Sequence, residues 1–181
     1  MALLGPLLRG VRAGAQRGPL CGADFAAPES ITVTSAAFAD GAAMPSSSAG
    51  KGVGGNTSPP LHWDGLPPET RQTVLIIDDI DVPLHRPLLH TVALIEPSLD
   101  RVAAGALQPG TAGVRFIRAD LGHRGYAGPR PIPGHGAHHY RFQLFAIDSP
   151  IPENVSTPRA LLAAMAGHVL ARGTLTGTYE R

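Results

Sequence analysis

His139-Tyr140-Arg141-Phe142-Gln143-Leu144-Phe145-Ala146-Ile147 is the stretch that decides the fold class of this chain. Successive side chains of a β-strand point to opposite faces, so one apolar face is shared by Tyr140, Phe142, Leu144 and Ala146. The stretch therefore predicts a strand packed against a core. Other apolar or β-branched runs predict further strands at 31–36, 73–78, 88–95, 113–117 and 174–179.

One helix is predicted late in the chain. Thr157 can cap its N-terminus, and Pro158 suits the first helical position, where a missing N–H costs nothing. Gly173 is expected to end the helix. The buried stripe of the helix would contain Leu161, Leu162, Met165 and Val169. Several strands, many Gly/Pro turns and one late helix predict a mostly β fold, a β-sandwich with a C-terminal helix.

The composition of the 181 residues excludes several classes of protein. Gly and Pro number 22 and 18, which is too many helix breakers for a helix bundle. Fifteen basic and fourteen acidic residues leave a net charge of +1, so the chain lacks the excess positive charge with which proteins bind nucleic-acid phosphates. The single cysteine, Cys21, excludes an intramolecular disulfide and a cysteine-based zinc site.

Residues 1–28 form a segment distinct from the domain predicted at 29–181. Helical spacing of apolar residues predicts a short amphipathic arm that packs on the domain or on a partner subunit, through Leu3, Leu4, Leu7, Leu8 and Val11. The arginines follow the apolar run, which is the wrong order for a secretory signal. No run reaches the roughly 18 apolar residues that span a bilayer. We therefore expect a cytoplasmic location and no integral membrane segment.

Carboxylates crowd the end of the most apolar run. Asp78-Asp79-Ile80-Asp81 places three of them within four residues, directly before Val82-Pro83. Charges this close repel, so at least one should be paired, hydrogen-bonded or raised in pKa. The segment is either a turn alone or a turn with a ligand site, and we favour the second. The crowding also suggests a cis Val82-Pro83 peptide bond.

Histidines gather in Gly134-His135-Gly136-Ala137-His138-His139-Tyr140, which follows one of two long Gly/Pro-rich loops, at 40–60 and 122–138. In a strand, His138 and Tyr140 share one face and His139 takes the other. His90 lies inside the apolar run 88–95. Alone it would be read as a satisfied core histidine, but with the carboxylate turn and the His/Tyr pair it could line one pocket.

Several enzyme chemistries lack their motifs. The chain has no Gly-x-Ser-x-Gly, no Walker A loop, no Gly-x-Gly-x-x-Gly after a strand and no His-Glu-x-x-His. A metal site of His135, His138 and Asp81 is conceivable, but the spacing is not that of a known zinc motif. We therefore expect no metal and no other cofactor.

Five segments in order resemble the phosphatidylethanolamine-binding protein family, in its bacterial YbhB/YbcL-type, Raf-kinase-inhibitor-like branch. Each is weak alone, but together they span about residues 29–181. They are Asn56-Thr57-Ser58-Pro59-Pro60-Leu61-His62-Trp63, Asp79-Ile80-Asp81-Val82-Pro83, Leu88-Leu89-His90-Thr91-Val92, the stretch from Gly125-Tyr126 to Arg141-Phe142, and Gly177-Thr178-Tyr179.

The resemblance implies a two-sheet β-sandwich with a small pocket for phosphate or phosphorylated head groups. By motif position, its ligand-binding residues would be Asp79, Asp81, His90, His138 and Tyr140, with Pro131 and Pro133 as a wall. It further implies a non-catalytic binding protein, possible modulation of a kinase or protease, and a possible homodimer.

Two positions depart from the family pattern. Ile80 replaces a proline between the two motif aspartates, and His139 replaces the arginine after the motif histidine. A titratable histidine in place of a fixed cation predicts a looser, more pH-dependent Asp79/Asp81 site.

The residue chemistry supports an anion pocket independently of the resemblance. Imidazole N–H and phenol O–H groups donate to phosphate oxygens, and a neighbouring aspartate can orient an imidazole. Two alternatives stay open. One is a phosphoester hydrolase or other enzyme using His90 or His138 as acid/base. The other is a protease or kinase inhibitor acting through surface loops such as 40–60.

Overall fold

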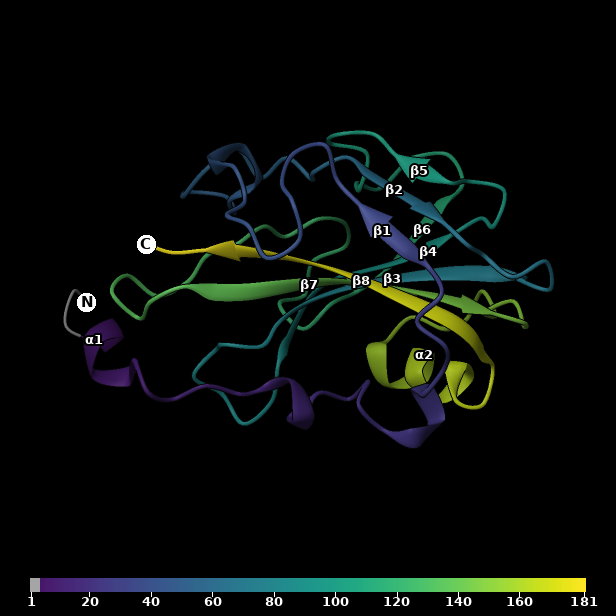
Figure 1. The fold of residues 1–181 in the computed structure, drawn as a ribbon, viewed down its shortest axis with the longest axis horizontal. Coiled ribbons are helices and arrows are strands. Elements are labelled where there is room, and N and C mark those ends of the chain that lie inside the picture. The colour runs from purple at the N-terminus through teal and green to yellow at the C-terminus, as the bar shows by residue number, and fades with distance from the viewer. Residues whose placement is uncertain (1–3) are drawn as a thin grey trace.

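Two antiparallel sheets form the framework of the computed structural model, which describes residues 4–181 (Figure 1). The smaller sheet has the order β1-β2-β5, with β1 at Thr32–Thr34, β2 at Leu61–Asp64 and β5 at Arg101–Val102. The larger has the order β6-β4-β3-β7-β8. Its bounds are β3 Gln72–Asp79, β4 Leu88–Ile95, β6 Val114–Ile117, β7 His138–Ile147 and β8 Val169–Tyr179. The predicted mostly β fold is confirmed, although β2 and β5 were not predicted.

Helical structure is limited to α1 at Leu4–Leu8, α2 at Pro158–Met165 and three short 3₁₀ turns, at Ala15–Arg17, Ala23–Phe25 and Ser46–Ser48. Thr157 caps α2 by accepting a hydrogen bond from the Ala160 N–H, as predicted. The predicted end of the helix is wrong. Gly167, at φ 76°, turns the chain out of the helix, and Gly173 lies within β8. A Cβ on Gly173 would collide with the Ile31 carbonyl oxygen, so close strand packing explains this glycine.

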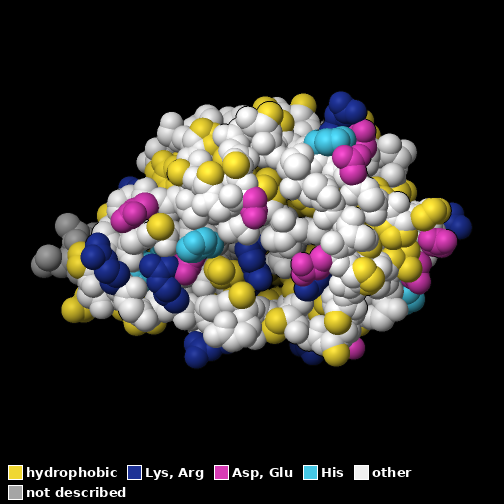
Figure 2. All heavy atoms as spheres, viewed as in Figure 1, with side chains coloured by type: hydrophobic (Ala, Val, Ile, Leu, Met, Phe, Trp, Pro, Cys, Tyr) yellow, Lys and Arg dark blue, Asp and Glu magenta, His cyan; other side chains and the backbone are white. Residues whose placement is uncertain are grey.

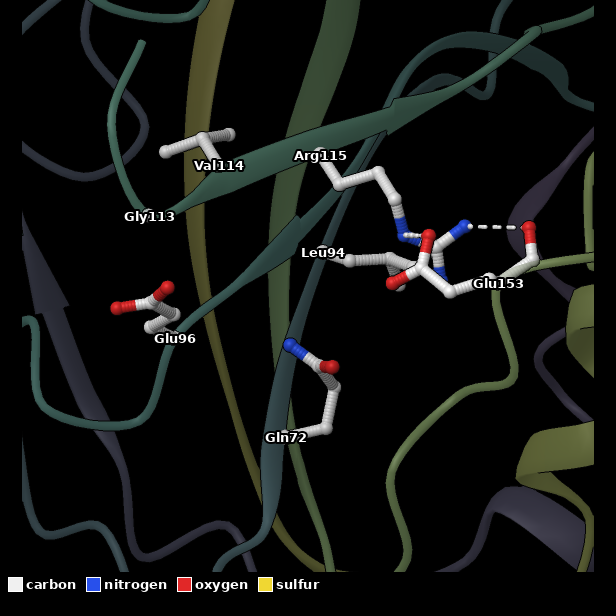
Figure 3. Close-up of a pocket in the computed structure, with 7 residues that line it drawn as sticks. All are labelled: Gln72, Leu94, Glu96, Gly113, Val114, Arg115 and Glu153. Atoms are coloured by element: carbon white, nitrogen blue, oxygen red, sulfur yellow. Dashed lines mark hydrogen bonds and ion pairs between the residues drawn. The ribbon is translucent and has the colours of Figure 1, made fainter.

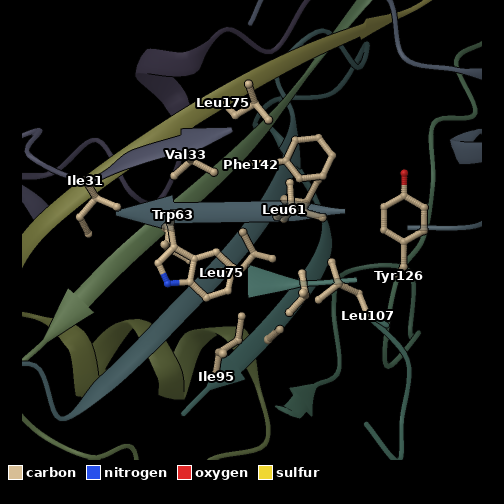
Figure 4. Close-up of a cluster of buried hydrophobic side chains, with 14 of the residues drawn as sticks. Ile31, Val33, Leu61, Trp63, Leu75, Ile95, Leu107, Tyr126, Phe142 and Leu175 are labelled. Carbon is tan, nitrogen blue, oxygen red and sulfur yellow. The ribbon is translucent and has the colours of Figure 1, made fainter. Parts of the chain in front are cut away.

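The main core fills the space between the two sheets (Figure 4). Trp63 of β2 is buried there, and its indole N–H donates to the Leu99 carbonyl. The face of β7 predicted from alternation is buried in this core through Tyr140, Phe142, Leu144 and Ala146. Alternation along β7 therefore decides which side chains point between the sheets.

A second core covers the outer face of the large sheet. Helix α2 contributes Leu161 and Met165, and the N-terminal arm, residues 4–28, contributes Leu20 and Phe25. In Figure 1 the arm runs below the large sheet, on the side opposite the small sheet, and α2 lies on that same side. The outer face of β7, which carries Arg141 and Gln143, therefore faces the arm.

Backbone hydrogen bonds add to the contacts that hold the arm. The Ala13 N–H donates to the Val82 carbonyl (2.9 Å), and the Gly14 N–H donates to the Ile80 carbonyl (2.8 Å). Of the predicted apolar stripe, Leu8 is half-buried and Leu4, Leu7 and Val11 are exposed; Leu3 lies outside the described residues. Within residues 4–181 no helix has the length and apolarity to cross a membrane.

Every peptide bond between described residues is trans. The hypothesis of a cis Val82-Pro83 bond is therefore wrong. The crowding that motivated it is relieved because the three aspartates point in different directions and find separate partners.

Candidate functional site

The aspartate cluster at the end of β3 is divided between the two faces of the large sheet. In the β3–β7 register, Asp78 lies opposite Arg141 and Asp79 lies opposite Tyr140. Neighbouring strand residues point to opposite faces, so Asp78 joins Arg141 on the outer face and Asp79 joins Tyr140 on the inner face. Asp81 follows in the turn. Strand alternation thus keeps the three charges apart.

Asp78 forms a buried two-point ion pair with Arg141. Arg141 Nε donates to Asp78 Oδ1 (3.0 Å), and Nη2 donates to Oδ2 (2.6 Å). The Asp78 side chain is 0% exposed. Burial raises the pKa of Asp78, and this effect outweighs the opposing hydrogen bonds from Arg141. The guanidinium therefore offsets the free-energy cost of burying this carboxylate.

Asp81 binds both the arm and β7. Arg12 Nη1 contacts Asp81 Oδ1 (2.5 Å) and also donates to the Ala137 carbonyl (2.9 Å). The backbone N–H and ring Nδ1 of His139 both approach Asp81 Oδ2, each at 2.7 Å. The expectation that the aspartate turn would lack a fixed cation is therefore wrong. The arm supplies Arg12 from 69 residues away, a contact that local sequence cannot predict.

Acid should weaken the fold through Asp81. Burial raises its pKa, but the hydrogen bonds from Arg12 and His139 outweigh burial and hold the pKa below its usual value of 3.8. A carboxyl whose folded pKa is depressed contributes stability above the unfolded pKa and loses it as pH falls through the folded pKa. We expect Asp81→Asn to flatten the fall in the free energy of unfolding between about pH 5 and 3, measured by urea denaturation. An equal fall in wild type and variant would contradict this prediction.

A β-bulge places His90. Ile77 of β3 pairs with Thr91 of β4, but the next residue, Asp78, pairs with Leu89, so His90 is the extra residue. The bulge shifts the alternation of β4 and allows the His90 ring to reach Tyr140. The two ring centres lie 5.3 Å apart, edge to face.

Four groups form a hydrogen-bonded chain from the inner face of the sheet to the arm. Asp79 Oδ2 lies 2.7 Å from His138 Nδ1, and His138 Nε2 lies 2.7 Å from His135 Nδ1. His135 Nε2 then lies 3.2 Å from the Val11 carbonyl oxygen. All three side chains are buried. Both ring nitrogens of His138 are therefore occupied within the protein.

The acceptors at the two ends of this series fix the direction of the end bonds. The Val11 carbonyl oxygen and an Asp79 carboxylate oxygen accept, so the first faces a His135 N–H and the second a His138 N–H. The two histidine rings therefore connect Asp79 to the arm.

Two buried polar atoms beside these groups make no well-formed hydrogen bond in the described part of the chain: His90 Nε2, and the Tyr140 hydroxyl, which Asp79 and the Arg130 backbone approach. His90 Nδ1 donates to the Ala127 carbonyl (3.0 Å), so the neutral ring presents a lone pair at Nε2. Burial lowers the pKa of His90, which favours this neutral form. Burial raises the pKa of Tyr140, and Asp79 raises it further through its charge and as an acceptor, so the hydroxyl stays protonated and can donate.

A recess of about 280 Å³ opens above His90. Two cations line it, Lys51 from the 40–60 loop and Arg130 from the 122–138 loop. Tight contacts hold these loops together: the Gly50 N–H donates to the Pro129 carbonyl, and the Tyr126 hydroxyl donates to the Ser48 carbonyl. The remaining polar lining includes Asn56 and His123. The recess therefore combines a buried histidine with a cationic rim.

The structure brings most of the predicted ligand residues together, but not all at one surface. Asp79, His138 and Tyr140 lie beside His90 in one buried cluster, and only His90 lines the recess. Asp81 belongs to the arm contact, and Pro131 and Pro133 do not line the recess. Sequence reasoning missed Lys51 and Arg130. Lys51 is the single lysine of the chain and lies in a Gly-rich loop, and this pattern could have marked it as a candidate ligand residue.

Another recess, of about 250 Å³, lies at the β6 edge of the large sheet and includes Gln72, Glu96, Arg115 and Glu153 (Figure 3). The Arg115 side chain is occupied by backbone carbonyl groups. Its guanidinium donates to the carbonyl oxygens of Ile151 (3.0 Å) and Val155 (3.2 Å), and so holds the loop before α2. Among residues 4–181 no three His, Cys, Asp or Glu side chains are grouped to hold a metal ion.

The two-sheet fold, with a buried Asp/His/Tyr cluster at one end of its large sheet, places this protein among the β-sandwich proteins. The chain belongs to the phosphatidylethanolamine-binding protein family, which it matches over residues 34–180. The resemblance seen in the sequence is thereby confirmed.

Similar proteins come from bacteria and archaea. A UPF0098 protein of Pyrococcus abyssi is 32% identical over 158 residues, covering 84% of this chain and 87% of that protein. The solved structure of Escherichia coli YbcL, described as a member of the mammalian PEBP family, has a TM-score of 0.77 at 26% identity, covering 84% of this chain and 99% of YbcL. A putative PEBP homologue from Chlamydia trachomatis has a TM-score of 0.75 at 30% identity over the same shares.

Proposed function

We propose that this protein is a non-catalytic binding protein whose recess above His90 takes a small phosphate-type anion. One observation carries the proposal. His90 lines the recess and its buried Nε2 has no partner among the described residues, while the Tyr140 ring, 5.3 Å away, carries a buried hydroxyl with no well-formed hydrogen bond there. Buried polar groups without a partner cost free energy, so a ligand that satisfies both would bind favourably.

Charge at the rim supports an anion. Lys51 and Arg130 line the recess, and no carboxylate side chain does. Phosphate oxygens accept hydrogen bonds from ammonium, guanidinium and phenol groups, and charge assistance strengthens these bonds. The family takes its name from the binding of phosphatidylethanolamine. A phosphorylated head group as the natural ligand agrees with that name.

Binding should take up a proton. A phosphate oxygen can meet the lone pair of His90 Nε2 only through a hydrogen, carried by the phosphate or gained by the ring. We therefore expect the affinity for O-phosphorylethanolamine to fall as pH rises from about 5.5 to 8.5, by at most ~10-fold per pH unit for one proton. Calorimetric titration across this range measures it, and flat affinity would contradict the proposal.

Two conservative variants sharpen the test. Tyr140→Phe removes only the hydroxyl, and His90→Asn keeps a donor for the Ala127 carbonyl while removing Nε2. Each should weaken binding about 10-fold, the loss of roughly one good hydrogen bond. His168→Gln is the matched control, because His168 is half-exposed and pairs with Asp148. Unchanged binding in Tyr140→Phe would rule out the hydroxyl as a contact.

The Asp79–His138–His135 chain would then act behind the recess by fixing the surroundings of Tyr140. The His138 and Tyr140 rings stack with centres 6.4 Å apart, at an angle of 22°. Modulation of a kinase or protease, formation of a homodimer and a cytoplasmic location stay predictions from the sequence.

A further inference from the structure

A separate cavity lies between the arm and the outer face of the large sheet. It measures about 300 Å³, and we call it the arm–sheet cavity. Strands β7 and β8 supply Arg141, Gln143 and Arg172, and the arm supplies Gln16, Leu20 and Cys21. On the side seen in Figure 2, Lys or Arg atoms lie in a hollow near the middle of the molecule. Tyr140 points to the opposite face of β7, so this cavity is not the recess above His90.

Two buried N–H donors in this cavity have no partner within residues 4–181: Gln143 Nε2 and Arg172 Nε. Gln143 is only 6% exposed, although glutamine usually stays at the surface. A buried amide that donates to nothing costs free energy, and such a group in a native structure requires an explanation. A bound acceptor would provide it.

The charge of the lining favours an anionic acceptor. Two arginines line the cavity and no carboxylate does. Arg141 uses Nε and Nη2 for Asp78, and Arg172 uses Nη2 for Glu29 (2.6 Å), so each guanidinium keeps N–H groups for another partner. Guanidinium groups bind carboxylate and phosphate oxygens with favourable geometry. A water takes about 30 Å³ of liquid, so the cavity has room for a small anion.

We propose that the arm–sheet cavity binds a small oxyanion, a carboxylate or phosphate group, through Arg172, Gln143 and the free edge of Arg141. The donors come from two strands, and the arm closes the cavity from the other side. The ligand would therefore connect the arm to the sheet.

The test is NMR of the side-chain N–H groups in the full chain. Spectra of Gln143→Met and Arg172→Gln assign the Gln143 amide and Arg172 Nε–H signals by their absence. Sodium phosphate and sodium acetate are then titrated separately, with ionic strength held constant by sodium chloride. We expect both wild-type signals to move saturably with at least one of the two anions, which also distinguishes a phosphate from a carboxylate ligand.

The variants give the matched comparison. Gln143→Met keeps the size of the side chain and removes an unpartnered donor, so it should leave the melting temperature unchanged or higher. It should weaken anion binding about 10-fold, the expected loss for one good hydrogen bond. Arg101→Gln, which removes an exposed arginine on the small sheet, should bind like wild type.

Three results would overturn the proposal. The signals could fail to move, which would mean that water fills the cavity. Gln143→Met could bind the anion as tightly as wild type. Tyr140→Phe could abolish the response, which would assign it to the recess above His90. Loss of recess binding alone would instead contradict only the proposed function.

Discussion

Replacing Arg141 by leucine is expected to lower the free energy of unfolding by about 3–5 kcal/mol, the usual cost of leaving one member of a buried ion pair alone. Asp78 is 0% exposed, and Arg141 is its only charged partner in the described residues. Without the guanidinium, a carboxylate would remain inside the protein with neither water nor a cation. Urea denaturation at pH 7 measures the loss.

A double variant separates the charge from the packing. Asp78→Asn combined with Arg141→Leu removes the buried charge, so it should be more stable than Arg141→Leu alone. The single variant should also recover as the pH falls. Burial raises the pKa of Asp78, and a carboxyl whose folded pKa is raised favours the folded state when it is protonated. A change below about 1 kcal/mol in Arg141→Leu would show that the pair contributes like a surface pair.

Replacing His138 by alanine should also lower the free energy of unfolding, by about 3 kcal/mol, because a buried carboxyl on the opposite face of the sheet loses its hydrogen-bond partner. Asp79 is 2% exposed, and His138 is its side-chain partner at 2.7 Å. Asp79 keeps the Asp81 N–H (2.9 Å) and the nearby Tyr140 hydroxyl, neither of which carries a full charge. His135 also loses its ring partner. Thermal unfolding of the variant measures the effect.

His168→Ala provides the matched control for this second prediction. His168 also pairs with a carboxylate, Asp148, at 2.8 Å, but both side chains are nearly half exposed. Its loss should change stability by less than about 1 kcal/mol. Equal effects in the two variants would show that burial of Asp79 is not what makes His138 important. If the prediction holds, loss of ligand binding in His138→Ala would reflect unfolding, and Tyr140→Phe is the better probe of the site.

Both predictions depend on how β3 ends. Alternation sends Asp78 to the outer face and Asp79 to the inner face. One strand end therefore supplies a carboxylate to the arm–sheet side and another to the recess side. The buried cluster on the inner face also reaches the arm, through His135 and the Val11 carbonyl. The arm thus contacts residues from both faces at this end of the large sheet.

Local sequence determined the parts of the protein whose chemistry repeats along one strand or one helix. The period of two in 139–147 predicted which face of β7 is buried, because burial of alternate residues follows from strand geometry alone. The run 88–95 matches β4, and Thr157-Pro158 marks the start of α2, because a capping bond forms between near neighbours. The same local motifs carried the family resemblance.

Only the tertiary structure decided which partners these side chains meet. Arg12 reaches Asp81 across 69 residues, Arg141 reaches Asp78 across 63, and Val11 reaches His135 across 124. The bulge at His90 depends on how β4 pairs with β3, and the place of Gly173 inside β8 depends on its close approach to Ile31. Such contacts form between segments that are distant in sequence, so no local pattern contains them. Only the fold brings together the ion pairs, the buried N–H donors without a partner and the arm.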